Sequence, residues 1–379
     1  MHSNHKVVPF VSFAVPFPPN YGGVIDVYYK IVKLKELGVS VILHAFTYDG
    51  RQQEDLTSIC EEVHFYEREK SFLNQFSLLP FIVKSRHNES LLSRLLEDDY
   101  PIVFEGLHST FFIQHPKLKY RSKFLRMHNI ESDYYFHLYK AEKKWLNKMF
   151  FFFESRKLKR YENRILKLQD VKILAISQKD HNYLQSTFGN SHFVGAFHSF
   201  DEVVSMEGMG DFAFYHGKLD VAENNEAAIF LVNKVFSKTS YRLVIAGANP
   251  SKELLECAAT LSNVQIESAL STNEIHRLLR EAQINVLPTF QSTGVKLKLL
   301  SALFSGIFCL VNDTMVAGTS LGHLCTIANT PDEWIKSLNE LSLRNFTRQD
   351  VAQRKSIESS AFSNDSNGKA LYALLFPSS

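Results

Sequence analysis

Short apolar segments alternate with amphipathic helical segments along most of this 379-residue chain. In the stretch 282–312, an apolar segment ending at Pro288 is followed by a polar loop, a helical pattern that stops at Gly306 and a second apolar segment. Because proline cannot extend a β-ladder and glycine commonly ends a helix, this stretch predicts strand, loop, helix and strand. The same order recurs in both halves of the chain, and it predicts an α/β fold with two doubly wound parallel sheets.

The length and the apolar content of the chain are sufficient for two domains. Hydrophobic residues make up 45% of the sequence, which is enough for two separate cores. A polar stretch with methionine and glycine, 201–211, separates the two alternating series. We predict an N-terminal domain over residues 1–200 and a C-terminal domain over 201–350. A polar linker and a terminal helix that can pack back on the N-terminal domain are predicted over 351–379.

The small net charge and the cysteines argue against several classes of protein. A net charge of +2 argues against nucleic-acid binding through a basic surface. The four cysteines form no C-x-x-C pair and stand mostly in apolar segments, as expected of reduced thiols in a cytoplasmic protein. The first residues lack the cleavage pattern of a signal peptide, and no apolar run approaches the roughly 18 residues of a membrane span. We therefore expect a cytoplasmic protein that binds no nucleic acid.

Two lysines in the first turn of the helix expected after Gly294 suggest a bound anion. Lys296 and Lys298 oppose the helix dipole, which already carries partial positive charge at that end. A bound anion would explain both residues. Surface lysines on an ordinary crossover helix explain them equally well, because lysine is a good helix former.

The N-terminal half has two further candidate features at expected strand ends. Gly22 and Gly23 open a helix after a proline-rich loop, where they would let a ligand approach the backbone, although an ordinary helix-entry turn is an equal alternative. His108 and His128 each follow an expected strand, so both should lie at the same edge of the sheet. A single histidine is more often a structural residue, and that alternative stays open for either one.

The segment 140–168 is expected to be helical, basic and aromatic. It combines Trp145 and four consecutive phenylalanines, 150–153, with lysines and arginines. One interpretation is a solvated basic face above an aromatic stripe that is buried in the core. The other is contact with an anionic membrane surface through Lys143, Lys144, Lys148 and Arg156.

The order of these motifs resembles that of the nucleotide-sugar glycosyltransferases of GT-B fold, in particular the retaining family-four glycosyltransferases (glycosyl transferases group 1). The segments that carry the resemblance are PFPPNYGGVIDVYYKIVKLKELGVSVILHAF, FEGLHS, RMHNIE, FYHGKLDVAENNEA and TGVKLKLLSALFSG. The resemblance covers nearly the whole chain. It implies two Rossmann-like domains that face a cleft, with the acceptor on the N-terminal domain and the nucleotide-sugar donor on the C-terminal domain.

The resemblance also implies roles for individual residues. His108 and His128 are the catalytic candidates. The candidate donor-binding and phosphate-binding residues are Gly22, Gly23, Lys218, Asn225, Thr293, Gly294, Val295, Lys298 and Ser301. The family usually has two glutamates, eight positions apart, and alignment on Gly306 places Thr293 and Ser301 at their positions.

The implied function is transfer of a sugar from a nucleotide diphosphate sugar to a carbohydrate or lipid-linked acceptor in surface glycan synthesis, with retention of the sugar's configuration. The chain has no D-x-D motif, so we expect no metal and no cofactor besides the nucleotide-sugar substrate. Lys218, Lys298 and the helix start at Gly294 would meet the charge on the leaving diphosphate. The alternatives are a catalytically weakened GT-B binding partner, suggested by Thr293 and Ser301, and another GT-B enzyme such as a nucleotide-sugar epimerase. The expected location is cytoplasmic, with peripheral attachment at the inner face of the membrane.

Overall fold

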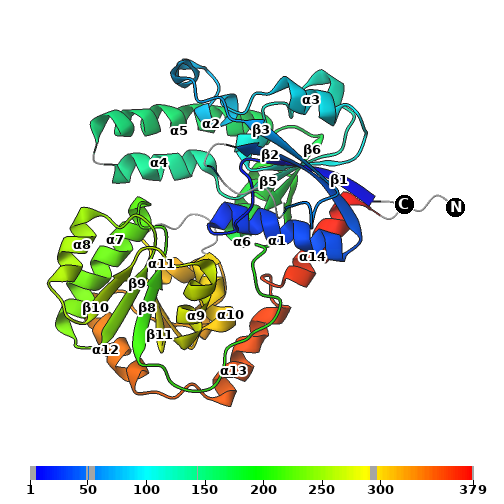
Figure 1. Ribbon diagram of the computed structural model, residues 1–379. Helices are drawn as coiled ribbons and strands as arrows, with labels where there is room; N and C mark the ends of the chain where they lie inside the picture. Colours follow the sequence, from blue (N-terminus) through cyan, green and yellow to red (C-terminus); the bar gives the residue numbers. More distant parts are fainter. Residues whose placement is uncertain (1–5, 48–49, 51–55, 143, 291–296, 378–379) are drawn as a thin grey trace. The chain divides into compact units, whose positions relative to one another are not determined.

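The computed structural model describes residues 6–377 except 48–49, 51–55, 143 and 291–296. The chain forms two compact units, and it passes from one to the other between Phe197 and His198 and again between Ser363 and Asn364. The first unit therefore contains both ends of the described chain, while the second is formed by residues between the two crossings (Figure 1).

The first unit is built on a seven-stranded sheet in the order β3-β2-β1-β4-β5-β6-β7. Neighbouring strands pair in parallel throughout. The central strand β1 is buried over nearly its whole length, which explains its uninterrupted apolar sequence, since both faces of a parallel sheet are covered. The strands are β1 (Lys6–Ser12), β2 (Val39–Thr47), β3 (Glu62–Glu67), β4 (Ile102–Glu105), β5 (Lys123–Met127), β6 (Val171–Ala175) and β7 (Ser191–Phe193).

Helices cover both faces of this sheet. Phe10 of β1 belongs to the core beneath α1 and α14, and Val11 belongs to the core beneath α3 and α5, because successive residues of a strand face opposite sides. The helices of the first unit are α1 (Gly22–Glu36), α2 (Phe81–Lys84), α3 (Glu89–Leu95), α4 (Glu131–Ala141), α5 (Trp145–Ile165), α6 (Gln178–Phe188) and α14 (Asn364–Leu375).

The second unit repeats the plan with a six-stranded sheet in the order β10-β9-β8-β11-β12-β13, again parallel. Its strands are β8 (Phe212–His216), β9 (Arg242–Ala246), β10 (Val264–Glu267), β11 (Ile284–Leu287), β12 (Phe308–Val311) and β13 (Thr326–Ile327). Its helices are α7 (Ala222–Phe230), α8 (Lys252–Ala259), α9 (Thr272–Glu281), α10 (Leu297–Ser305), α11 (Asp313–Val316), α12 (Pro331–Ser342) and α13 (Arg348–Arg354). The prediction of two doubly wound parallel sheets is confirmed.

One predicted helix differs from the structure. The segment 140–168 is not one helix, because α4 ends at Ala141 and Glu142 is extended before α5 begins at Trp145. In the second unit, α7 begins at Ala222 after an N-cap at Val221, so the candidate residue Asn225 lies in the first turn of this helix.

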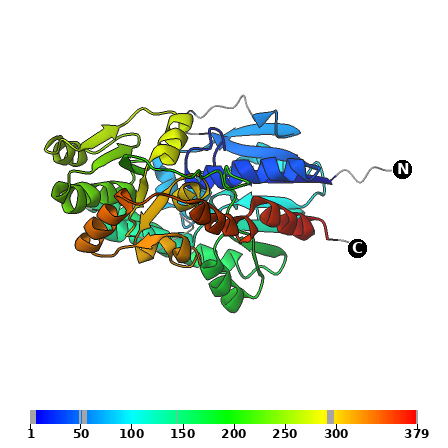
Figure 2. The ribbon, with the colours of Figure 1, turned by 90° about the horizontal axis from the view of Figure 1, so that it is seen from below.

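The predicted linker is also helical in part. The buried Arg354 of α13 donates hydrogen bonds to the carbonyl oxygens of Leu303 (2.9 Å) and Ile307 (2.8 Å), so residues 351–363 pack within the second unit. The terminal helix α14 packs against α1 in the first unit (Figure 2). At this contact, Nζ of Lys33 lies 2.9 Å from the Asp365 carboxylate. Within the described residues, no helix is both long enough and apolar enough to cross a bilayer.

Candidate functional site

The strand order of the second sheet reverses between β8 and β11, so the loops after these strands diverge at its carboxyl edge. The loop after β8 leads into α7, and the loop after β11 leads toward α10. Open parallel sheets bind ligands at such a point, where the loops leave a crevice and a helix N-terminus offers free backbone N–H groups. This edge is the candidate ligand site of the second unit.

The ammonium group of Lys298 connects α10 with β8 and α7 at this edge. Its Nζ donates a hydrogen bond to Oδ1 of Asn224 (2.7 Å) and lies 3.4 Å from the hydroxyl of Tyr215. The same atom lies 5.0 Å from the centroid of the Tyr215 ring, within the range of a cation–π interaction. The Tyr215 hydroxyl donates in turn to the carbonyl oxygen of Asn224 (3.1 Å). These contacts fix a positive charge beside the end of β8 and the start of α7.

Two buried polar atoms at this edge have no hydrogen-bond partner among the described residues: Nε2 of His216 and Oδ1 of Asn225. Burial and the ammonium of Lys298 lower the pKa of His216 to about 3, so its imidazole is neutral at physiological pH. A buried polar atom without a partner is unfavourable by roughly 1–3 kcal/mol, and a bound ligand can remove that penalty. One cation and two unpartnered polar atoms suit a ligand that carries phosphate and hydroxyl groups.

The backbone is closely packed at this edge because two glycines lack side chains. A Cβ on Gly247, directly after β9, would lie 1.9 Å from the carbonyl oxygen of Gly217, and a Cβ on Gly217 would lie 3.0 Å from Cγ of Asn224. Sequence reasoning did not identify Gly247, Asn224 or the two strand residues Tyr215 and His216. Its position directly after an apolar run could have identified Gly247, because a glycine there often marks a close approach of two backbone segments.

The other predicted residues of this half have different surroundings. Lys218 follows β8, its side chain is 56% exposed, and its Nζ lies 3.6 Å from the Asp220 carboxylate. Ser301 is half-buried in α10, one turn after Lys298, so both are positioned on the same side of the helix. The remaining predicted residues of the donor site fall outside the described residues: Thr293, Gly294 and Val295.

In the first sheet the order reverses between β1 and β4, and His108 lies at this point in the short helix η3 (Leu107–Ser109). Gly106 precedes it with φ of 68°, a left-handed conformation that favours glycine. The ring of Phe13, just after β1, lies 5.4 Å from the ring of His108 and 5.6 Å from that of His128. Phe13 therefore brings the two predicted histidines together around one aromatic side chain.

The Gly22-Gly23 pair opens α1 beside the same phenylalanine. A Cβ on Gly23 would lie 2.7 Å from Cζ of Phe13, whereas a Cβ on Gly22 would meet nothing within 4 Å. The close approach at Gly23 is therefore an approach to the protein's own aromatic ring. Gly22 is exposed and keeps open space at the helix start.

His108 has a neutral imidazole in these surroundings. Burial, together with the nearby Arg86 and His128, holds the pKa of His108 well below its usual range. Its Nδ1 is buried and has no hydrogen-bond partner within the described part of the chain. A neutral imidazole with an unused nitrogen can accept a proton or a hydrogen bond from a ligand.

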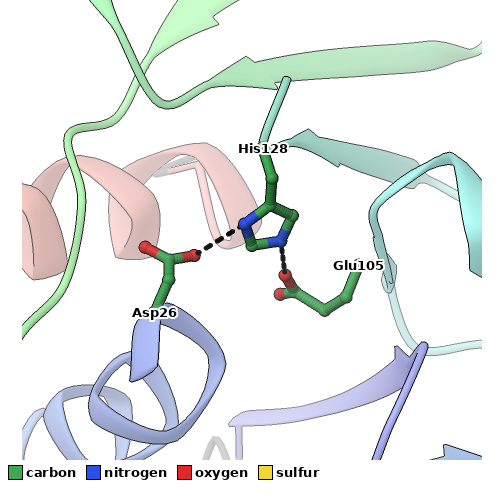
Figure 3. Close-up of side chains that lie close together, drawn as sticks. All are labelled: Asp26, Glu105 and His128. Atoms are coloured by element: carbon green, nitrogen blue, oxygen red, sulfur yellow. Dashed lines mark hydrogen bonds and ion pairs between the residues drawn. The ribbon is translucent and has the colours of Figure 1, made fainter. Parts of the chain in front are cut away.

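Both ring nitrogens of His128 face carboxylates (Figure 3). Nε2 lies 3.1 Å from the Glu105 carboxylate, and Nδ1 lies 3.9 Å from that of Asp26. Nζ of Lys30 lies 2.8 Å from each of these two carboxylates. Arg126 binds Asp26 through two nitrogens, at 2.8 and 3.1 Å. This arrangement engages His128 in a buried network, so the geometry favours His108 as the histidine that meets a ligand.

Charge compensation keeps the buried carboxylates of this network ionised. Burial alone would raise the pKa of Asp26, but Arg126 and Lys30 hold it well below its usual range. Burial acts on Glu105 in the same way, and Lys30 and His128 outweigh it, so that the pKa of Glu105 is also lowered. Two buried carboxylates and two buried cations therefore balance each other.

Asp26, Glu105 and His128 place one ligand atom each within 4.8 Å of one another, a spacing that a metal ion could use. The ammonium of Lys30 already lies between the two carboxylates. A divalent cation would have to displace Lys30 and would add charge to a balanced network. These residues therefore do not fit a metal centre.

A second pair of buried acids lies where β5 leads into α4. Burial and the neighbouring Glu162 raise the pKa of Glu131, the first residue of α4, to about 8. Burial also raises the pKa of Glu162 of α5 to about 7, although its carboxylate accepts hydrogen bonds from the backbone N–H of Ser132 (3.2 Å). At least one proton is therefore held between α4 and α5 at neutral pH.

Two parallel-sheet units of this topology define the GT-B fold, and solved structures share it. The chain is similar to WaaG, described as a glycosyltransferase involved in lipopolysaccharide biosynthesis, with 11% identity and a TM-score of 0.63 over 98% of this chain and 100% of that one. It is similar to Anabaena HepE, solved with UDP and glucose, with 13% identity and a TM-score of 0.64 over 98% and 99%. It is also similar to a mutant of S. aureus TarM solved with fondaparinux, alpha-GlcNAc-glycerol and UDP, with 10% identity and a TM-score of 0.65 over 98% and 100%.

At the level of sequence, no family model matches the chain. A Klebsiella pneumoniae protein, described as an uncharacterized 44.6 kDa protein in the cps region, is 25% identical over 332 residues. The match covers 83% of this chain and 84% of that protein. The chain thus has the GT-B fold, and its sequence is similar to a protein encoded in a cps region.

Proposed function

We propose that this protein is a glycosyltransferase that moves a sugar from a nucleotide diphosphate sugar to a glycan or lipid-linked acceptor in surface glycan synthesis. The observation that carries the proposal is the fixed ammonium of Lys298 beside the buried, unpartnered polar atoms of His216 and Asn225, at the switch point of the second sheet. The similarity to WaaG, HepE and TarM and to a protein of a cps region supports the same activity.

The chemistry of the proposed donor site follows from charge. Negative charge builds up on the leaving diphosphate as the glycosidic bond breaks, and fixed cations and backbone N–H groups stabilise it. Lys298 and the start of α7 provide both beside β8, and the exposed Lys218, which is paired with Asp220 at 3.6 Å, is proposed to contribute a second cation from the neighbouring loop. We propose that the reaction needs no metal ion and retains the configuration of the sugar.

The proposed role of the first unit is to bind the acceptor and meet the reacting sugar. His108 is suited to this role because its imidazole is neutral and its Nδ1 is unused by the described residues. A neutral imidazole can orient an acceptor hydroxyl or take its proton. His128, bound between carboxylates, would support His108 from the buried network behind Phe13.

Release of nucleoside diphosphate from a panel of nucleotide sugars tests the proposed function. UDP-sugars come first in the panel, because HepE and TarM were solved with UDP. Saturable release that increases when a glycan or lipid-linked acceptor is added would support a transferase. Binding of nucleotide sugars without release would instead point to a binding partner, and conversion of the sugar without release would point to an epimerase.

Replacing His108 tests the proposed role of the first unit. His108→Gln keeps a polar side chain of similar length but cannot take up a proton, so turnover is expected to fall by more than about tenfold. The affinity for UDP should stay close to that of the parent, because the donor site lies in the second unit. Turnover and UDP affinity are compared at equal folded fraction. A variant that unfolds at lower temperature and loses both properties together would indicate a structural histidine.

We also propose that the protein is cytoplasmic and attaches reversibly to the anionic inner face of the membrane. The side chains of Trp145 and Phe153 on α5 are 72% and 57% exposed. The interpretation that places these two residues in the core is therefore wrong. Lys144, Lys148 and Arg156 are on the same helix or at its start, while Lys143 lies outside the described residues. Aromatic residues with nearby cations suit the interface of an anionic bilayer.

Vesicle co-sedimentation measures this attachment. Binding to vesicles with anionic phospholipid is expected at low salt, since each cation near the surface contributes up to about 1 kcal/mol. It should fall steeply at physiological ionic strength, where charges act over only about 8 Å. Neutral vesicles are the control. Equal binding to neutral and anionic vesicles, or none to either at low salt, would contradict the proposal and favour a soluble acceptor.

A further inference from the structure

A groove of about 730 Å³ lies in the first unit, between α5 and the short helix η2 (Phe72–Phe76) with the residues after it. Phe76, Met149, Phe150 and Phe153 line it. Phe76 is 74% exposed and Phe153 is 57% exposed, so large aromatic surfaces are open to solvent around the groove. A volume of this size is typical of small-molecule sites, and an exposed apolar surface of this kind generally marks a binding surface.

The wall opposite α5 is fixed by a buried polar anchor. Nζ of Lys157 donates to the carbonyl oxygens of Gln75 (2.9 Å) and Ser77 (3.2 Å), and it also forms an ion pair with Glu154. The buried Glu154 accepts a hydrogen bond from the backbone N–H of Phe81 (2.7 Å). These bonds tie the segment after η2 and the start of α2 to α5, so the groove is a built feature of the unit.

The side of α5 that lines the groove changes from apolar to cationic along the helix. Met149, Phe153, Arg156 and Arg160 are spaced four, three and four residues apart, which places them in one stripe about 16 Å long. The guanidinium of Arg156 lies 5.0 Å from the centroid of the Phe152 ring. Among the described residues, neither Arg156 nor Arg160 has a carboxylate within ion-pair distance. One end of the stripe is therefore apolar, and the other carries two positive charges not balanced by nearby described acids.

We propose that this groove binds one molecule of an anionic lipid, with its hydrocarbon chain against Phe76, Met149 and Phe153 and its phosphate at Arg156 and Arg160. An apolar surface excludes water from the chain, and guanidinium groups bind phosphate oxygens with paired N–H donors. The proposal deepens the proposed function and rests on it in one respect, namely that the lipid carries the acceptor sugar. The binding of the lipid itself does not depend on the transfer reaction.

Titration calorimetry with decyl phosphate, below the concentration at which it forms micelles, tests the groove directly. The full-length protein is expected to bind it saturably, and decyl maltoside, which has the same chain but no charge, at least about tenfold more weakly. The double variant Arg156→Gln with Arg160→Gln should lose about tenfold or more in affinity for decyl phosphate. Phe153→Asn should weaken both ligands, because it removes apolar surface from the groove.

Two variants serve as matched controls. Lys159→Gln removes an exposed cation from α5 that does not line the groove, and Leu78→Asn removes a 94% exposed apolar residue from beside it. Both should bind decyl phosphate like the parent. Equal affinity for the two ligands, an unaffected double arginine variant, or an equal loss with Lys159→Gln would overturn the proposal. Donor turnover with a soluble acceptor is measured in the parent and in the same variants. The double arginine variant is expected to lose lipid binding and keep normal turnover. A parent that turns over donor but does not bind decyl phosphate refutes only the groove, whereas a parent that binds decyl phosphate without turnover refutes only the transferase.

Discussion

Lys298→Ala is expected to lower both turnover and affinity for UDP by about 10-fold to 150-fold. A charge-assisted hydrogen bond to phosphate contributes roughly 1.5–3 kcal/mol, and each 1.4 kcal/mol corresponds to a factor of ten. The ammonium is held in place by Asn224 and by the ring of Tyr215, so it needs little rearrangement when the diphosphate arrives. Turnover should fall at least as far as affinity, because charge on the diphosphate increases during bond cleavage.

The measurement is a UDP titration together with steady-state kinetics on the best donor of the panel. Lys252→Ala is the matched control, since Lys252 lies on α8 of the same unit with a 91% exposed side chain. It should leave both quantities unchanged. If Lys298→Ala matches the parent in UDP affinity and in rate, the assignment of the phosphate site to this edge is wrong.

Glu131→Gln is expected to stabilise the protein at high pH and not at low pH. A carboxyl whose pKa rises from 4.5 in the unfolded chain to about 8 in the folded protein keeps its proton on folding. The folded state then binds more protons than the unfolded state between these values, so the free energy of unfolding decreases as pH rises from about 4.5 to about 8. For Glu131 this loss is at most roughly 4–5 kcal/mol. Glutamine resembles the protonated acid at every pH and removes this loss.

Thermal unfolding followed by circular dichroism at pH 5, 7 and 9 measures this effect. The difference in midpoint between Glu131→Gln and the parent should be small at pH 5 and largest at pH 9. Asp133→Asn changes an exposed acid in the same turn of α4 and should show no such trend. A midpoint difference that stays constant with pH would show that Glu131 is ionised in the folded protein, contrary to its buried position beside Glu162.

Part of the candidate site follows from sequence because strand ends are easy to locate. His108 and His128 follow apolar runs, and in a doubly wound fold such runs end at one edge of a sheet. The structure brings both against Phe13, as expected of neighbouring strand ends. Their different surroundings could not be predicted, since Asp26 and Arg126 are 100 residues apart in the chain. Only the sheet order places α1 and β5 so that these two charges meet next to His128.

The ends of helices were harder to predict from the sequence than the strands. An unpredicted helix end changed which side chains are exposed. No proline or glycine marks the break between α4 and α5, where the backbone N–H of Lys144 donates to the Glu142 side chain (2.8 Å). The break makes a helical hairpin whose second helix exposes Trp145 and Phe153, and composition alone cannot distinguish that from burial in a core.

The sequence by itself determined the two parallel sheets, because strands buried on both faces give uninterrupted apolar runs that end at breakers such as Pro288, and the helices between them end at glycines such as Gly306. It also determined that Lys298 stands near the start of a helix at the edge of the second sheet. Only the tertiary structure decided that Lys298 contacts Asn224, a residue that the sequence did not single out, while the predicted Asn225 lies next to it in the first turn of α7. The physical reason is helical phase: each residue turns the side-chain direction by about 100°, so the residue that faces a ligand site depends on where the helix begins and on how it packs.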